Sequence, residues 1–185
     1  MTPEDLLFLG GEYDLTVDSN NRLSLPAVLR STIQERFGEI LVLLIGVNNK
    51  PWIYPEKYYR KLMAKLIPQD VPAEAILRFA HSNISMTFPV TMDKQGRFVL
   101  PDKIIRRSHL KDEQGEKPGA VDITVTGVRD HLEVWKRMDW EIYCNEINSN
   151  PEDVKLRAKM LMSQVADVAN QTPGEQSKVA LSPTA

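Results

Sequence analysis

Cysteine is almost absent from this sequence. Cys144 is the only one in 185 residues, so no disulfide can form within the chain. Because it lies at an apolar position of an expected helix, we predict a small core residue rather than a nucleophile. There is also no signal peptide and no apolar run long enough to cross a bilayer, which predicts a cytoplasmic protein without a membrane partner.

The usual sequence signatures of catalysis are missing as well. There is no glycine-rich nucleotide loop, no cluster of Cys and His at metal-binding spacing and no nucleophile motif. The histidines are scattered, and each is expected at the surface or hydrogen-bonded within the fold: His81, His109 and His131. We therefore expect no enzyme, no cofactor, no metal and no small-molecule substrate. A perturbed titratable group in a cleft would argue the other way.

The sequence also lacks an excess of positive charge. Its formal net charge is −2, so any binding of nucleic acid must depend on local basic patches. A hydrophobic content of 42% and a charged content of 26% are ordinary for a globular protein. Four aromatic residues at strand ends and helix faces are expected in the core rather than on a base-stacking surface: Trp52, Tyr54, Trp135 and Trp140.

What the sequence does contain is one short phrase that occurs twice, at residues 18–26 and 93–101. Aspartate, arginine, leucine and proline recur in it at a constant offset of 75. Apolar and polar residues alternate in front of each copy, which predicts a half-buried strand. The middle of each phrase holds a pair that tolerates the positive φ of a tight hairpin turn: Asn20-Asn21 and Gln95-Gly96. Each phrase is therefore predicted to form a hairpin.

The repetition continues beyond the hairpins. Residues 41–54 match residues 122–135 at an offset of 81, with Gly46 aligned to Gly127. Both copies then run into a helix with apolar residues on one face. The six additional residues of the second copy fall in the charged stretch 112–119, which predicts a longer surface loop. These matches indicate an internal duplication, and two units of about seventy residues are expected to share one core.

The duplication and the proline positions divide the chain into segments. We expect a first repeat at 7–67, a linker at 68–84 with a helix over 73–81, a second repeat at 85–150, a helix at 151–170 and a disordered tail at 171–185. Within the first repeat we expect a helix at 26–36, strands at 40–47 and 52–54, and a helix at 55–67. The apolar arm at 1–10 is expected to pack on the fold or on a neighbour. The heptad-like seam of the last helix is compatible with docking on its own chain or with contact between subunits.

These residues together resemble the MraZ family of bacterial transcription factors, within the wider group of AbrB-like swapped-hairpin barrels. The resemblance covers residues 7–147 and depends on the doubled Asp-x-x-x-Arg-[Leu/Phe]-x-Leu-Pro, the opening Phe8 to Tyr13, and the strand ends Trp-x-Tyr-Pro and Glu-Val-Trp. It implies an α+β fold, namely a duplicated swapped-hairpin β-barrel that forms a pseudo-dimer within one chain. It further implies a nucleoid-associated, cyclic homo-oligomer that binds short repeated motifs of double-stranded promoter DNA. The implied role is regulation of the division and cell-wall gene cluster, including its own promoter; repression is the expected direction, and activation is the alternative that the sequence leaves open.

The resemblance also assigns the site residues. The family's motif falls on Asp18 with Arg22 and on Asp93 with Arg97, and Asn20-Asn21 stands where the family usually has Lys-Gly. Residues 87–111 contain six basic side chains against two acidic ones, a balance of +4, whereas residues 12–30 have a balance of −1. The candidate DNA-binding residues are therefore Asp18, Asn20, Asn21, Arg22, Arg30, Asp93, Lys94, Arg97, Arg106 and Arg107.

Arginine suits this role because its planar fork can grip phosphate or the O6/N7 edge of guanine. From the charge balance we expect Arg97→Ala to weaken DNA binding more than Arg22→Ala. The plainer interpretation is that both aspartates bond their own turns and the arginines form solvated ion pairs. A second function, an oligomeric adaptor of the same fold that binds protein, is distinguished by binding that is insensitive to salt.

Overall fold

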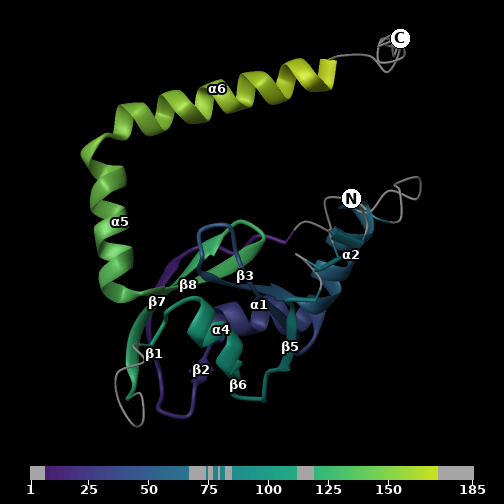
Figure 1. The fold of residues 1–185 in the computed structure, drawn as a ribbon, viewed down its shortest axis with the longest axis vertical. Helices are drawn as coiled ribbons and strands as arrows, with labels where there is room; N and C mark the ends of the chain where they lie inside the picture. The colour runs from purple at the N-terminus through teal and green to yellow at the C-terminus, as the bar shows by residue number, and fades with distance from the viewer. Residues whose placement is uncertain are drawn as a thin grey trace, which may run out of the picture. The chain divides into compact units, whose positions relative to one another are not determined.

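The structure is a computed structural model that describes residues 7–66, 74, 77, 78, 80, 81, 85–111 and 119–170 (Figure 1). Most of the expected linker helix, most of the charged loop and the whole expected tail lie outside the described residues. Among the helices that are described, none is long and apolar enough to cross a membrane.

The described elements follow the expected order in both repeats. The first repeat contains β1 (Glu12–Val17), β2 (Arg22–Ser24), α1 (Ala27–Phe37), β3 (Ile40–Ile45), β4 (Pro51–Pro55) and α2 (Glu56–Leu66). The second contains β5 (Phe88–Thr91), β6 (Arg97–Val99), α4 (Asp102–Arg107), β7 (Val121–Val128), β8 (His131–Lys136) and α5 (Arg137–Ser149), and α6 (Pro151–Asn170) follows. Both short helices begin directly after a proline, because a helix start needs no amide hydrogen from that residue.

Six strands form one antiparallel sheet in the order β1-β7-β8-β4-β3-β5, and β2 pairs with β6 in a separate two-stranded ribbon. The order reads the same from both ends when each strand is exchanged for its counterpart in the other repeat. The leading strand of each repeat pairs with the other repeat, since Leu15 of β1 lies opposite Ile123 and Val90 of β5 lies opposite Leu41. The fold is therefore α+β, with an antiparallel sheet and short helices.

Leu15 and Val90 are equivalent positions of the two repeats, so their partners Ile123 and Leu41 are equivalent as well. The sequence alignment matches Leu41 with Asp122 instead, so the two differ by one residue. The difference arises in the turns. Five residues are enclosed by the pair Ile45–Pro51, whereas four are enclosed by the corresponding pair Gly127–Leu132. Matching the glycines aligns the turns, but the pleat of a strand fixes which side chains face the core, so register follows burial instead.

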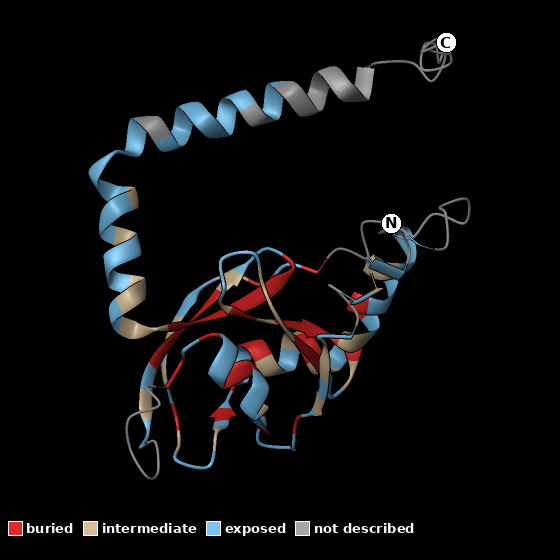
Figure 2. Cartoon of the chain, viewed as in Figure 1, coloured by how far each residue is buried: buried red, intermediate tan, exposed pale blue. Residues whose placement is uncertain are grey.

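Both repeats contribute to one hydrophobic core, which Figure 2 shows as red segments in the sheet and in the short helices. Its fully buried members include Leu43 and Ile53 from the first repeat and Val125 and Val134 from the second. The expected packing of the N-terminal arm is confirmed for its two described leucines but not for Phe8, which is exposed. Leu7 and Leu9 are buried, and the Leu9 amide donates to the Arg129 carbonyl at 2.6 Å.

The chain divides into two compact units, residues 1–140 and 141–185, and both repeats' strands lie in the first. Within α5 no residue is fully buried, and Cys144 is only half-buried. The prediction that Cys144 is a core residue is therefore wrong. The corresponding helix α2 does bury side chains, Tyr58 and Tyr59, because they pack against the core of the sheet.

Candidate nucleic-acid interface

The two repeated phrases meet in the β2–β6 ribbon. Its cross-strand pairs are Arg22 with Val99, Leu23 with Phe98, and Ser24 with Arg97. The middle pair is buried, and successive side chains of a strand point to opposite faces. Both arginines therefore lie on the same exposed outer face, although they are 75 residues apart in the sequence.

The second turn, between β5 and β6, is held by its aspartate. The Asp93 carboxylate accepts from the Gln95 amide at 2.8 Å and from the Arg97 amide at 3.0 Å, and Gly96 has φ 79°. The Arg97 Nε also donates to Asp93 at 2.8 Å. These bonds, first from the Arg97 backbone and then from its side chain, lower the pKa of Asp93. The half-buried Arg30 packs here, since a Cβ on Gly96 would lie 3.0 Å from its Cδ.

The first turn, between β1 and β2, has the same backbone pattern. The Asp18 carboxylate accepts from the amides of Asn20 and Arg22, both at 2.8 Å, and Asn21 has φ 61°. A tight turn is thus confirmed at both sites, and so is the role of each aspartate in its own turn. Each loop holds three residues, and only its last residue has a positive φ. The strands on either side of a loop lie in different sheets, so the two phrases do not form the paired hairpins that the sequence predicts. Among the described residues the Arg22 guanidinium has no ion pair, in contrast to that of Arg97.

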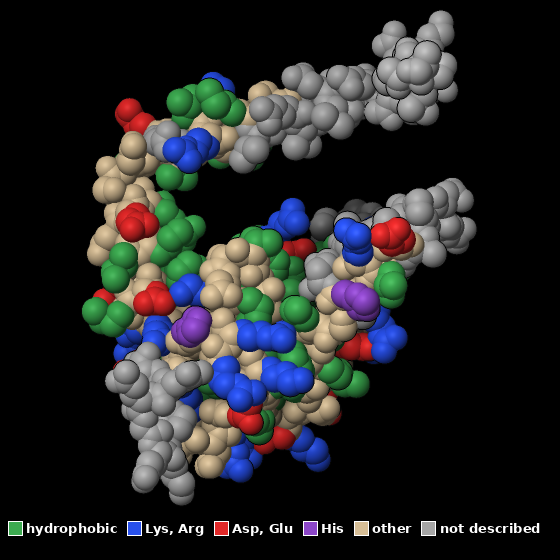
Figure 3. Space-filling model, in the orientation of Figure 1, with side chains coloured by type: hydrophobic (Ala, Val, Ile, Leu, Met, Phe, Trp, Pro, Cys, Tyr) green, Lys and Arg blue, Asp and Glu red, His purple; other side chains and the backbone are tan. Residues whose placement is uncertain are grey.

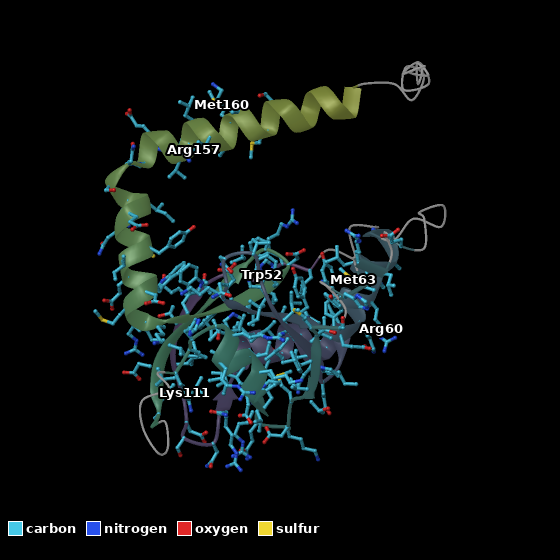
Figure 4. All side chains as sticks on the ribbon, in the orientation of Figure 1. Trp52, Arg60, Met63, Lys111, Arg157 and Met160 are labelled. Atoms are coloured by element: carbon cyan, nitrogen blue, oxygen red, sulfur yellow. The ribbon has the colours of Figure 1, made fainter. Side chains whose placement is uncertain are left out.

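A buried lysine of the second repeat holds the first turn in place. Lys111 Nζ donates to the Asp18 carbonyl at 2.6 Å and to Asn21 Oδ1 at 2.8 Å. The side-chain Nδ2 of Asn21 in turn donates to the Asp102 carboxylate at 2.9 Å, a bond that glycine could not make because it has no side chain. Burial lowers the pKa of Lys111. Figure 4 labels this residue beside the β1–β2 connection.

Lys111 therefore has a different role from the one expected. The charge balance of residues 87–111 places Lys111 in the basic patch of the second repeat, but its side chain is buried and its charge lies under the first turn. The two turns consequently differ less in local charge than the sequence indicates.

We expect Lys111→Met to lower the free energy of unfolding by about 1–3 kcal/mol, because the Asp18 carbonyl and the Asn21 side chain each lose a donor. The measurement is urea denaturation. Lys103→Met on the exposed side of α4 is the matched control and should change stability by less than about 0.5 kcal/mol. An equal loss in both variants would contradict the role of Lys111.

Exposed basic residues surround the ribbon. Lys94 lies in the second turn, and α4 presents Lys103, Arg106 and Arg107 to solvent. In Figure 3 the blue side chains gather on the same part of the molecule, where Figure 1 places α4 and the ribbon. A polar hollow of about 310 Å³ on the ribbon is lined by Arg22, Thr91, Asp93, Arg97, Phe98 and Val99. The ribbon, its two turns and α4 thus form one basic surface.

Comparison with known proteins gives a match to the family described as "MraZ protein, putative antitoxin-like" over residues 8–79 and 84–161. The chain belongs to the MraZ family. Each matched segment contains one Asp-x-x-x-Arg turn, Asp18 to Arg22 in the first and Asp93 to Arg97 in the second.

Relatives named "Transcriptional regulator MraZ" are similar over most of their length. The protein from Clostridium tetani is 33% identical over 147 residues, which cover 78% of this chain and 92% of the relative. The one from Moorella thermoacetica is 31% identical and covers 77% and 90%. The one from Thermoanaerobacter sp. (strain X514) is 28% identical and covers 79% and 93%.

This MraZ-family chain also contains a buried polar cluster that the sequence analysis missed. The His131 ring packs against both Trp52 and Tyr54, with ring centroids 4.2 and 5.0 Å away. Its Nδ1 is 2.9 Å from an Asp130 oxygen, and its Nε2 is 3.6 Å from a Glu133 oxygen. The default of a hydrogen-bonded histidine is confirmed. The available signal was one histidine with an acidic residue on either side of it, Asp130 and Glu133, but the aromatic partners come from the other repeat.

Proposed function

We propose that this protein is a sequence-specific, DNA-binding transcriptional regulator that reads duplex DNA with the outer face of the β2–β6 ribbon. One observation carries the proposal: the ribbon brings Arg22 and Arg97, one from each repeat, onto a single exposed face. Had they lain on opposite sides of the fold, they could not have shared one DNA groove. The names of the relatives support the same class of function.

The chemistry of this surface fits a major groove. A two-stranded ribbon can enter that groove, and each arginine can contact guanine through two hydrogen bonds. The surrounding lysines and arginines supply phosphate contacts that fix position without reading sequence: Arg30, Lys94, Lys103, Arg106 and Arg107. Asp18 and Asp93 keep the two turns in shape, and Asn20 is exposed at the tip of the first.

The proposal includes a swapped-hairpin duplication and self-association into a ring. The symmetric strand order supports the duplication, since β1 pairs with the second repeat and β5 with the first. Exposed apolar side chains such as Phe8 and Val28 support self-association, because they line an open hollow of about 420 Å³ near the N-terminal arm. A ring would bind tandem promoter motifs tightly, because the first contact raises the effective concentration for the next. In the proposed case these motifs lie in the promoter of the division and cell-wall genes, which the protein would repress.

The test is a gel-shift titration of the full chain against duplexes tiled across its own upstream region. We expect affinity to fall steeply with salt, with a slope of log K against log salt of about −5 for roughly six phosphate contacts. A duplex with several motif copies should bind about a hundredfold more tightly than one with a single copy. Equal affinity for both duplexes would remove the ring from the proposal. Binding that does not respond to salt would remove DNA and favour a protein-binding adaptor.

A further inference from the structure

The two halves of the ribbon are not equivalent. The position two residues after the arginine differs between the repeats: it is Ser24 in the first and Val99 in the second. Pairing across the ribbon sets Val99 opposite Arg22 and Ser24 opposite Arg97. Each arginine therefore has a different neighbour on the face proposed to meet DNA.

Val99 is an apolar side chain in polar surroundings. It is 51% exposed, and it lines the same hollow as both arginines and Asp93. The other apolar residue of β6, Phe98, points inward and is buried. In an antiparallel pair the Cβ atoms of directly opposed residues are about 5 Å apart, so Val99 and Arg22 act on adjoining positions. A single exposed valine is common on protein surfaces, but this one lies beside both arginines on the face proposed to contact DNA.

We infer that Val99 reads the C5-methyl group of a thymine next to the guanine held by Arg22; this inference rests on the proposed DNA-binding function. The thymine methyl is the apolar group that the major groove offers for direct readout. Neighbouring strands of a ribbon are about 4.8 Å apart and successive bases are about 3.4 Å apart along a strand, so opposed residues reach adjacent base pairs.

The other half of the ribbon has a different preference. Ser24 carries a hydroxyl group, which can donate or accept, and it presents no methyl group to a thymine. The pair Arg97–Ser24 therefore accepts more than one base beside its guanine. A motif bound by the ribbon has one half with an obligatory thymine and one half without it.

The test uses duplexes that the full chain selects from a randomised pool. Each thymine of the enriched duplex is replaced in turn by uracil, which removes only the methyl group. For the unmodified protein we expect one position beside a guanine where uracil lowers affinity about fourfold, as burial of one methyl group predicts. Val99→Ser should bind the thymine and uracil duplexes equally. Ser24→Val should show a second uracil-sensitive position, which also guards against misfolding of the first variant.

Two results overturn the inference and differ in meaning. In the first, a motif is enriched and binds with salt dependence, but no uracil replacement lowers the affinity, or no thymine lies beside a guanine. This result removes the role of Val99 and leaves DNA binding in place. Failure to enrich any motif, together with no salt-dependent binding to the pool, removes the proposed function and the inference together.

Discussion

Replacing both ribbon arginines in one variant, Arg22→Ala with Arg97→Ala, should lower the affinity for the selected duplex by about a hundredfold or more. Each bidentate contact with a base is worth about 1–3 kcal/mol, and about 1.4 kcal/mol corresponds to a factor of ten. Fluorescence anisotropy at fixed salt measures the loss. Because both side chains are exposed, the free energy of unfolding should change little.

The single variants, Arg22→Ala and Arg97→Ala, test how much each repeat contributes to DNA affinity. The sequence predicts the larger loss for Arg97→Ala, from the charge balance alone. In the structure Arg97 is already paired with Asp93, Arg22 has no ion pair among the described residues, and Lys111 adds its charge under the first turn. We therefore expect comparable losses from the two single substitutions.

Arg60→Ala is the matched control for these variants. Arg60 is an exposed arginine of α2 that pairs with Glu56 four residues earlier, as Arg97 does with Asp93, but it lies outside the ribbon (Figure 4). It should leave DNA binding unchanged. Full affinity in the double variant, or an equal loss in Arg60→Ala, would contradict recognition by the ribbon.

Local features of the interface could be predicted from the sequence. The positive φ of Asn21 and of Gly96 follows from residue types that tolerate the left-handed conformation. The bonds from Asp18 and Asp93 to their own turns follow from the short acceptor side chain. Each of these features depends on contacts within about five residues.

Features that depend on contact between the repeats could not be predicted in the same way. The duplication predicts two hairpins, but it does not say that β2 pairs with β6 and so places the arginines on one face. Counting charges along the chain cannot reveal that Lys111 is buried. Which residues of β3 and β7 correspond in the two repeats follows the pleat rather than the aligned glycines, so it too is decided by packing.

The buried histidine has the largest expected effect on stability. Burial alone would lower the pKa of His131, but the nearby carboxylates of Glu133 and Asp130 outweigh burial, so the pKa is raised. The same contact lowers the pKa of Glu133 against the effect of its own burial. The Tyr58 hydroxyl and Arg129 also face Asp130, at 3.3 and 3.7 Å. A protonated His131 between two carboxylates and two aromatic rings therefore stabilises the folded state.

The sign of the pH dependence follows from these directions. His131 contributes its full stabilisation below its unfolded pKa of about 6.5 and loses it as the pH rises through the higher folded value. Glu133 contributes above its unfolded pKa of about 4.3 and loses its share as the pH falls through the lower folded value. The ion cluster should thus be most stabilising between about pH 4.5 and 6.5.

His131→Ala is accordingly expected to lower the free energy of unfolding by about 3 kcal/mol near pH 6, because buried Glu133 loses its cation and buried Asp130 keeps only the more distant Arg129. The loss should be smaller near pH 9, because the histidine of the unmodified protein loses its charge as the pH rises through the raised pKa. Urea denaturation at both pH values measures the difference, with His81→Ala at an exposed position as the control. The same loss at pH 6 and pH 9 would mean that His131 stabilises the sheet by packing against Trp52 and Tyr54 and not by its charge.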